Sequence, residues 1–256
     1  LAGLRAGLGV ISLNTEVRPQ ERRHALTVSG VSHVFIDQTA IDTGPMPSGL
    51  AHTVINPPTQ RPRGGLIGRL LGSKQTDSRP TDDLAAEINS TQPVEAPEAI
   101  AEEATGLMLF TSGTTNAPKV VQLSHRNLAA QLLTILKVYD YDTDSNILNV
   151  LPLHFTDGIM HGPVVAFLTG ATLFRPQNFI VQELDTILHG IYRDRITHFI
   201  VVPAILSIID RLRSDFDQIF RTPDFRYIRS SGDRLPKSLW KSIQSRFGVK
   251  VINTYG

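Results

Sequence analysis

The regular alternation of strand-like and helix-like stretches in the second half of the chain constrains its fold most. Short apolar runs bounded by turn residues predict buried strands, and the longer amphipathic stretches between them predict helices. The expected strands are 147–151, 171–174, 198–202, 225–229 and 249–253, and the expected helices are 126–138, 158–168, 181–193, 204–213 and 236–247. Strands that alternate with helices form a mostly parallel sheet covered on both faces, so we predict an α/β fold.

The composition divides the chain into three regions. Residues 1–38 are expected to form a βαβ segment, in which a helix over 18–28 connects two parallel strands. Residues 39–105 are rich in proline, glycine and charge, which predicts a polar, partly disordered excursion with a short helix near 82–88. Residues 106–256 make up the α/β region. Both ends of the chain look cut, so we expect a fragment of a larger protein.

Charge and cysteine content exclude several classes of function. The formal net charge is +1, so no global field favours nucleic acid as a partner. The chain has no cysteine, which excludes disulfides, thiolate zinc sites and a cysteine nucleophile. No apolar run approaches the length of a membrane span and no leader is visible, so we expect a cytoplasmic location. The apolar piece Leu66–Leu71, flanked by three cations, raises membrane-surface contact as an alternative to the favoured solvated loop.

The stretch Leu107–Asn127 places a polar loop between two apolar runs. The runs at 107–110 and 120–123 predict strands, and Ser124 is expected to be the N-cap of the next helix. Between the strands lie four hydroxyl side chains, one glycine, one lysine and no acid. Such donors suit a polyanion such as a triphosphate, and the alternative is an ordinary turn. The Walker pattern is absent, because no Gly-Lys-Ser/Thr follows at its spacing and a strand comes next.

The string T-S-G-T-T-x-x-P-K in this loop resembles the phosphate-binding loop of the acyl-adenylate-forming, or AMP-binding, enzymes. This superfamily includes acyl-CoA synthetases, peptide-synthetase adenylation domains and luciferases, and its large N-terminal domain has the α/β fold expected here. Asn116 and Val120 depart from the pattern, since the family usually has glycine at both positions. The resemblance implies an ATP-binding set of Thr111, Ser112, Gly113, Thr114, Thr115 and Lys119. Within this set it implies catalytic roles for Thr111, Thr114 and Lys119.

A second stretch, Pro152–Gly158, follows an expected strand. His154 and Asp157 invite an acid–base or metal interpretation, but a metal site needs more ligands than this stretch supplies. The family has a proline, an apolar residue, an aromatic and usually a histidine here, lining the carboxylate pocket. Phe155 stands at the usual histidine position and His154 at the aromatic one. The resemblance implies a substrate pocket that includes His154, Phe155 and Gly158.

Two further turns resemble the family's adenine-binding segments. The turn Ser231-Gly232-Asp233 matches a glycine-rich turn whose backbone flanks adenine, although on its residues alone it could simply start a helix. Asn253-Thr254-Tyr255-Gly256 matches the start of the segment N-x-Y-G-x-T-E, whose tyrosine stacks on the base. The resemblance therefore implies cofactor-binding roles for Asn253 and Tyr255. The glutamate that would hold Mg²⁺ falls after Gly256, so no metal ligand is expected within the chain.

The resemblance implies an ATP-dependent acid–thiol ligase. Such an enzyme converts a carboxylic acid, here expected to be a fatty acid, to an acyl-AMP and transfers the acyl group to coenzyme A. ATP, Mg²⁺ and coenzyme A are the implied cofactors. The alternatives are an adenylation domain that loads an acyl or aminoacyl group onto a carrier protein, and a non-catalytic nucleotide-binding module.

The first prediction concerns the chain in isolation. The family's small C-terminal domain, with its catalytic lysine, and the acid that grips the ribose hydroxyls are not within these residues. We therefore expect the isolated 256 residues to show no acid-dependent ATP–pyrophosphate exchange. An exchange assay tests this, and exchange at a normal enzymatic rate would contradict it.

Overall fold

The computed structural model describes residues 1–14, 16–42, 44, 46–55, 88–111, 119–176, 179–212 and 214–255. The chain divides into two compact units. Unit 1 comprises Leu1–Asn14, Glu98–Thr111 and Val121–Gly256, and unit 2 comprises Thr15–Pro97 and Ser112–Val120. The apolar piece Leu66–Leu71 and most of the short helix expected near 82–88 fall outside the described residues.

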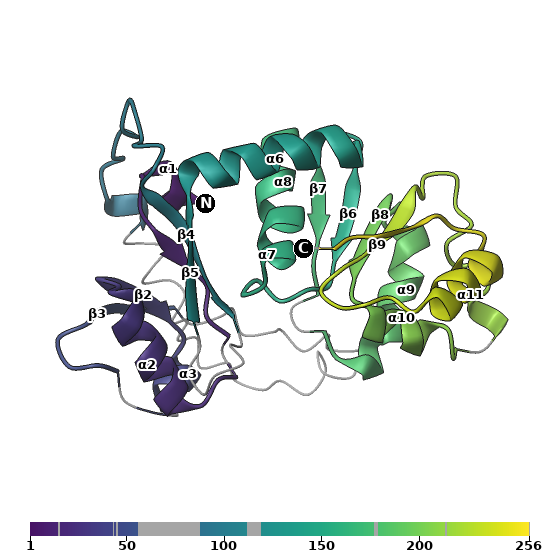
Figure 1. The fold of residues 1–256 in the computed structure, drawn as a ribbon, viewed down its shortest axis with the longest axis horizontal. Helices are drawn as coiled ribbons and strands as arrows, with labels where there is room; N and C mark the ends of the chain where they lie inside the picture. Colours follow the sequence, from purple (N-terminus) through teal and green to yellow (C-terminus); the bar gives the residue numbers. More distant parts are fainter. Residues whose placement is uncertain are drawn as a thin grey trace, which may run out of the picture. The chain divides into compact units, whose positions relative to one another are not determined.

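A five-stranded sheet forms the core of unit 1 (Figure 1). Its strand order is β10 (Val251–Asn253), β9 (Tyr227–Ser230), β8 (His198–Val201), β6 (Asn146–Asn149) and β7 (Thr172–Phe174), and every neighbouring pair is parallel. Every residue of β8 and β9 is buried, so both faces of the sheet are covered. The predicted α/β fold with parallel strands and helices on both faces is confirmed.

Helix α6 (His125–Tyr139) precedes the first strand of this sheet, and the other helices lie between its strands in sequence. They are α7 (Thr156–Ile159), α8 (Val165–Thr169), α9 (Leu184–Arg193), α10 (Pro203–Ile209) and α11 (Lys237–Phe247), with 3-10 turns at Val181–Glu183 and Ser214–Phe216. Ser124 caps α6 as predicted, because its Oγ accepts from the Asn127 backbone N–H at 3.2 Å and Asn127 Oδ1 accepts from the Ser124 N–H at 3.0 Å.

The single helix predicted over 158–168 is wrong. The structure has α7, then a π-helical turn at Met160–Val164, then α8. Gly162 leaves helical geometry at φ −126° and ψ −112°, directly before Pro163. Proline lacks an N–H and its ring clashes with the preceding turn, so a regular helix cannot continue through it. The break lies beside the end of β6, where the Asn149 side chain donates to the His161 carbonyl.

The remaining strands form two smaller sheets. Strand β4 (Thr105–Thr111) lies between β1 (Val10–Ile11) and β5 (Lys119–Ser124). In unit 2, α2 (Pro19–Ser29) leads to β2 (His33–Ile36), followed by α3 (Gln38–Asp42) and β3 (Ala51–Val54). A short helix, α1 (Ala2–Arg5), precedes β1.

The strands on either side of α2 do not pair with each other as the expected βαβ segment requires. Val10 of β1 is paired with Leu107 of β4, whereas β2 pairs in parallel with β3. Leu107 is buried in the core of unit 1, so β1 pairs with a strand that is itself part of this core. Strand β3 also lies within the stretch expected to be a polar excursion, so the early part of that stretch has regular structure.

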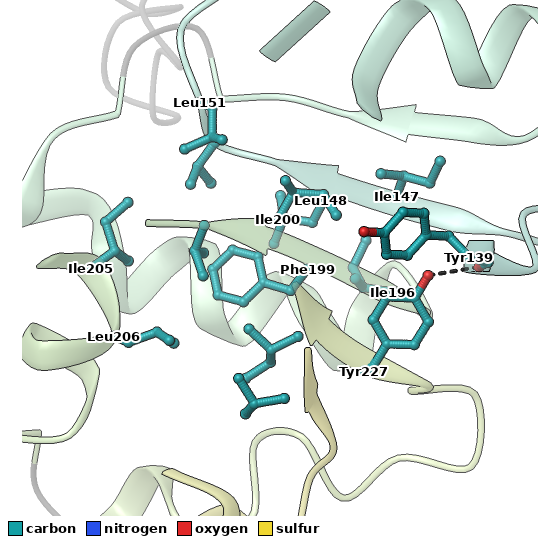
Figure 2. Close-up of a cluster of buried hydrophobic side chains, with 14 of the residues drawn as sticks. Tyr139, Ile147, Leu148, Leu151, Ile196, Phe199, Ile200, Ile205, Leu206 and Tyr227 are labelled. Carbon is teal, nitrogen blue, oxygen red and sulfur yellow. Dashed lines mark hydrogen bonds between the residues drawn. The ribbon is translucent and has the colours of Figure 1, made fainter. Parts of the chain in front are cut away.

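The hydrophobic core of unit 1 packs on the five-stranded sheet, as Figure 2 shows around Phe199. Phe199 and Ile147 have no exposed surface. At the rim of this cluster the Tyr227 hydroxyl donates to the Tyr139 carbonyl oxygen at 2.7 Å, which joins β9 to the end of α6 (Figure 2). Within the described ranges, no helix has the length and apolar character needed to cross a membrane.

Two histidines are buried beside this rim. His198 lies between the Tyr141 and Tyr227 rings, with centroids at 4.8 and 4.6 Å, and burial lowers its pKa to about 4. The Nδ1 of His161 lies 3.2 Å from the Tyr141 hydroxyl, and burial together with the nearby charge of Arg229 lowers the His161 pKa to about 3. Both histidines are therefore neutral in the folded protein at physiological pH.

The second prediction follows from these lowered pKa values. Below a pH of about 6.5 the unfolded chain binds protons that the folded chain does not, so stability decreases as the pH falls. Between about pH 6 and pH 4, the free energy of unfolding should fall by about 1.4 kcal/mol per pH unit for each histidine. Urea unfolding across this range measures the slope, and His198→Phe should reduce it. An unchanged slope in that variant would contradict the assignment.

Candidate functional site

The parallel register brings the ends of four strands to one edge of the sheet. Asn149 is level with Ile200 of β8, Val201 with Ser230 of β9, and Ser230 in turn with Asn253 of β10. The stretches after β6, β9 and β10 are those predicted to bind the acid and adenine. They lie at the carboxyl edge, where parallel α/β sheets bind ligands.

Asn149 fixes the course of the stretch after β6. Its fully buried side-chain amide donates to the carbonyl oxygens of Asp157 at 3.0 Å and His161 at 3.1 Å. Its side-chain oxygen accepts from the Leu151 N–H at 2.9 Å. One side chain thus satisfies backbone groups on both sides of the turn from β6 into α7, including the π-helical turn.

Gly158 allows the backbone to pass closely over itself in this stretch. A Cβ atom at Gly158 would lie 2.0 Å from the Pro152 carbonyl oxygen. Beside it, the rings of His154 and Phe155 are 4.2 Å apart, and the Phe155 side chain is exposed. The structure therefore presents Phe155 outward at the carboxyl edge, and the pocket roles of His154, Phe155 and Gly158 stay predictions.

The turn after β9 has a left-handed backbone conformation at its central residue, Gly232. Gly232 has φ +83°, a left-handed conformation that favours glycine. Asp233 is exposed, and its Oδ1 accepts from the Arg234 N–H at 2.6 Å. Helix α11 begins directly after its N-cap Pro236, so the alternative that this turn starts a helix agrees with the structure, and the adenine-binding role stays a prediction.

In the stretch after β10, hydrogen bonds hold Thr254 in place, whereas the next side chain, Tyr255, is exposed. Thr254 N–H donates to the Ser230 carbonyl at 2.9 Å, and its hydroxyl lies 3.1 Å from that of Tyr139. Asn253 and Tyr255 are exposed, and the Tyr255 ring is fully so. The adenine-binding roles of Asn253 and Tyr255 stay predictions.

The predicted phosphate loop is only partly described. Thr111 is the last residue of β4, and Lys119 is the exposed first residue of β5. The rest of the predicted phosphate-binding set, Ser112, Gly113, Thr114 and Thr115, lies outside the described residues, as does the Thr111 side chain. The structure thus supplies the two strands expected on either side of the loop.

A charged cluster joins two of the predicted segments. The Arg229 guanidinium donates through Nη2 to Asp157 Oδ1 at 3.0 Å and through Nη1 to Ser231 Oγ at 3.2 Å. The Ser231 hydroxyl in turn donates to Asp157 Oδ2. Burial opposes both charges, but Arg229 and Ser231 hold the pKa of Asp157 below its usual value, and Asp157 raises the pKa of Arg229. The pair is therefore ionised.

Sequence reasoning missed Arg229 and the role of Asn149. A signal was present, because an arginine inside an apolar strand of a parallel sheet must find a partner in the interior. The local pattern around Asp157 suggests only an acid or a metal ligand, whereas its partner Arg229 lies 72 residues away. Such a separation is not visible in local patterns.

A divalent metal ion in the described part of the site would need several ligands close together. Among the described residues, no three His, Cys, Asp or Glu side chains gather closely enough to hold an ion. The carboxylate of Asp157 already faces Arg229 and Ser231. The described residues therefore supply no ready cluster of three such ligands for a metal ion.

Comparison with known proteins identifies the family. A model of the family "AMP-binding enzyme" matches residues 1–256, and the chain belongs to this family. It is 26% identical over 261 residues to a sulfoacetate–CoA ligase of Cupriavidus necator, covering 100% of the chain and 46% of that protein. It is 29% identical over 184 residues to a mitochondrial malonate–CoA ligase of Mus musculus, covering 67% of the chain and 31% of that protein.

Solved structures agree on the fold. The crystal structure of ATP-bound MatB from Rhodopseudomonas palustris matches with a TM-score of 0.77 at 20% identity, over 100% of the chain and 46% of that protein. The chain thus spans less than half the length of each of these three proteins. Its resemblance to the adenylate-forming enzymes is confirmed, and the relatives described above are CoA ligases.

The third prediction tests the close approach at Gly158. In Gly158→Ala the new methyl group meets the Pro152 carbonyl, so the backbone must shift, and the free energy of unfolding should fall by about 1–3 kcal/mol. The matched control is Gly190→Ala in α9, where a Cβ meets only the ends of the Asp194 and Arg193 side chains at 3.3 and 3.4 Å. This control should be neutral or stabilising by up to about 1 kcal/mol. Equal stability of the two variants in urea unfolding would contradict the geometry.

Proposed function

We propose that the whole protein is an acid–thiol ligase that activates a carboxylic acid with ATP and transfers the acyl group to coenzyme A. In the first step a carboxylate oxygen bonds to the α-phosphorus of ATP while the bond to pyrophosphate breaks. In the second step the thiol sulfur attacks the acyl carbonyl, the thiol loses its proton, and AMP leaves. Adenylation removes the negative charge that protects a carboxylate and provides a good leaving group.

The single observation that carries this proposal is the direct link between two predicted ligand segments. Asp157, beside the expected acid pocket, is joined by Arg229 to Ser231, at the start of the expected adenine turn. A reaction between an acid and a nucleotide requires both to be held in one geometry, which is chiefly a matter of positioning. The family membership of the chain supplies the reaction class.

The proposal assigns different tasks to the strand ends. The hydroxyls of Thr111, Ser112, Thr114 and Thr115 and the Gly113 amide bind the β- and γ-phosphates, and Lys119 adds charge or braces the loop. The backbone at Gly232, with Asp233, Asn253 and the exposed ring of Tyr255, holds adenine. Phe155 borders the acyl group.

For the substrate we propose only the general class, a carboxylic acid. A fatty acid was expected from the stretch Pro152–Gly158 and its aromatic Phe155. The relatives reported above are named for sulfoacetate and malonate, which are short acids with a second acidic group. We therefore propose a carboxylic acid as substrate and leave fatty acids and short di-acids as the two classes to be distinguished by experiment.

Coenzyme A is the proposed acceptor, because both curated relatives described above are CoA ligases. A carrier-protein thiol is the alternative, and a non-catalytic module is the third. The whole protein should release pyrophosphate from ATP with an acid from a panel of fatty acids and short di-acids. Acyl-CoA formation then indicates the ligase, release without thioester formation favours carrier loading, and no release with any acid contradicts the proposal.

The fourth prediction tests the phosphate loop. In the whole protein, Thr114→Ala and Thr115→Ala each remove a hydroxyl donor, so kcat/KM for ATP should fall about tenfold or more. Thr134→Ala is a suitable control, since this exposed threonine on α6 donates its hydroxyl to the Ala130 carbonyl of the same helix at 3.0 Å. Pyrophosphate release at varied ATP measures the effect. Loop variants with the kcat/KM of the wild type would remove the loop from the mechanism.

A further inference from the structure

Arg229 is a buried cation beneath the carboxyl edge of the sheet. Its side chain is 3% exposed, whereas that of Asp157 is 26% exposed. The guanidinium lies 5.3 Å from the centre of the Tyr139 ring, and its Nε has no hydrogen-bond partner among the described residues. The charge is therefore held by Asp157, Ser231 and an aromatic face, with one donor left unsatisfied.

Stability alone does not explain such a pair. Taking two charges out of water opposes folding, and well-packed apolar side chains in the same place often stabilise a protein equally well or better. An unsatisfied Nε adds a further penalty. An apolar pair would lack directional hydrogen bonds. The planar guanidinium, in contrast, holds two acceptors at defined positions through separate nitrogen atoms.

The two acceptors belong to different segments of the site. Asp157 is anchored on its own side, since its carbonyl is held by Asn149 and its Oδ1 lies 3.8 Å from His161 Nε2. Ser231 begins the turn that contains Gly232, and its hydroxyl contacts both charged partners. The backbone bond from the Ser231 N–H to the Val201 carbonyl at 3.2 Å holds the turn to β8, and the Ser231 hydroxyl adds its polar contact with α7.

We propose that Arg229 is a positioning residue that ties the adenine turn at Ser231 to the acid-binding stretch at Asp157. Arg229 acts through these two residues and contacts neither substrate. Because of these contacts, the binding of the nucleotide and the binding of the acid both depend on the relative position of Ser231 and Asp157. This inference rests on the proposed function, because it assumes that the two segments bind these two substrates.

The fifth prediction uses the whole protein and separates folding from positioning. Arg229→Met or Asp157→Leu alone should destabilise the protein, because each leaves a buried charge unpaired. The double variant Arg229→Met/Asp157→Leu removes both charges and should unfold near the wild-type midpoint. Its KM for ATP and its KM for the best acid should nevertheless both rise about tenfold, since small misplacements strongly reduce productive binding.

Ser231→Ala provides a second variant that keeps the ion pair. It removes the hydroxyl contact between the turn and Asp157 while Asp157 stays bound to Arg229, so the KM for ATP should rise more than the KM for the acid. A purely structural role of the hydroxyl would lower the unfolding midpoint and leave both KM values unchanged. If the double variant does not fold, this variant decides the question.

The matched control lies at the opposite end of the same strand. Arg226, directly before β9, donates to Asp142 Oδ2 at 3.0 Å, and both side chains are partly exposed. Arg226→Met/Asp142→Asn should therefore leave both KM values unchanged. Wild-type KM values in a folded Arg229→Met/Asp157→Leu variant, or in Ser231→Ala, would overturn the proposal. A wild-type protein that is inactive with every acid would instead refute the proposed function, so the two failures are distinguishable.

Discussion

The parallel alignment of β6, β8, β9 and β10 is the constraint on which the candidate site depends. Because these strands share one direction and their ends are level, the residues that follow Asn149, Ser230 and Asn253 meet at one edge. The core beneath them contains residues with no exposed surface, such as Phe199 and Ile228, and this packing keeps the edge in place. The polar residues of the candidate site thus lie on a rigid sheet, as is common in α/β folds.

The buried charge of Arg229 shows how this chain adapts the common scaffold. Asp157, Ser231 and the Tyr139 ring surround the guanidinium, and Asn149 holds the backbone that carries Asp157. Together these residues connect the ends of α6, β6 and β9 with the start of α7 in unit 1. A polar network therefore connects the two predicted ligand segments. The energy of its hydrogen bonds depends more strongly on the distances and angles between the groups than the energy of apolar packing does.

The sequence predicted the α/β fold, most of the strands and the N-cap at Ser124, because each depends on local periodicity or on one residue type. It failed where distant contacts decide the structure. The helix broken at Pro163 has a local cause that was overlooked, whereas the pairing of β1 with β4 depends on a partner 97 residues away in sequence, as Val10 and Leu107 show. The pairing of Asp157 with Arg229 likewise needs the folded sheet, and the residues of the phosphate loop were recognised only through a family motif.

Acyl adenylation leaves a chemical trace that tests the central claim directly. The whole protein is incubated with ATP, coenzyme A and an acid whose carboxyl group carries heavy oxygen, and the AMP is analysed by mass spectrometry. Attack of the carboxylate on the α-phosphorus, followed by transfer to the thiol, leaves one carboxylate oxygen in AMP. We therefore predict AMP that contains one heavy oxygen atom. Label in inorganic phosphate with formation of ADP, or acid-dependent ATP cleavage that gives unlabelled AMP, would contradict the account.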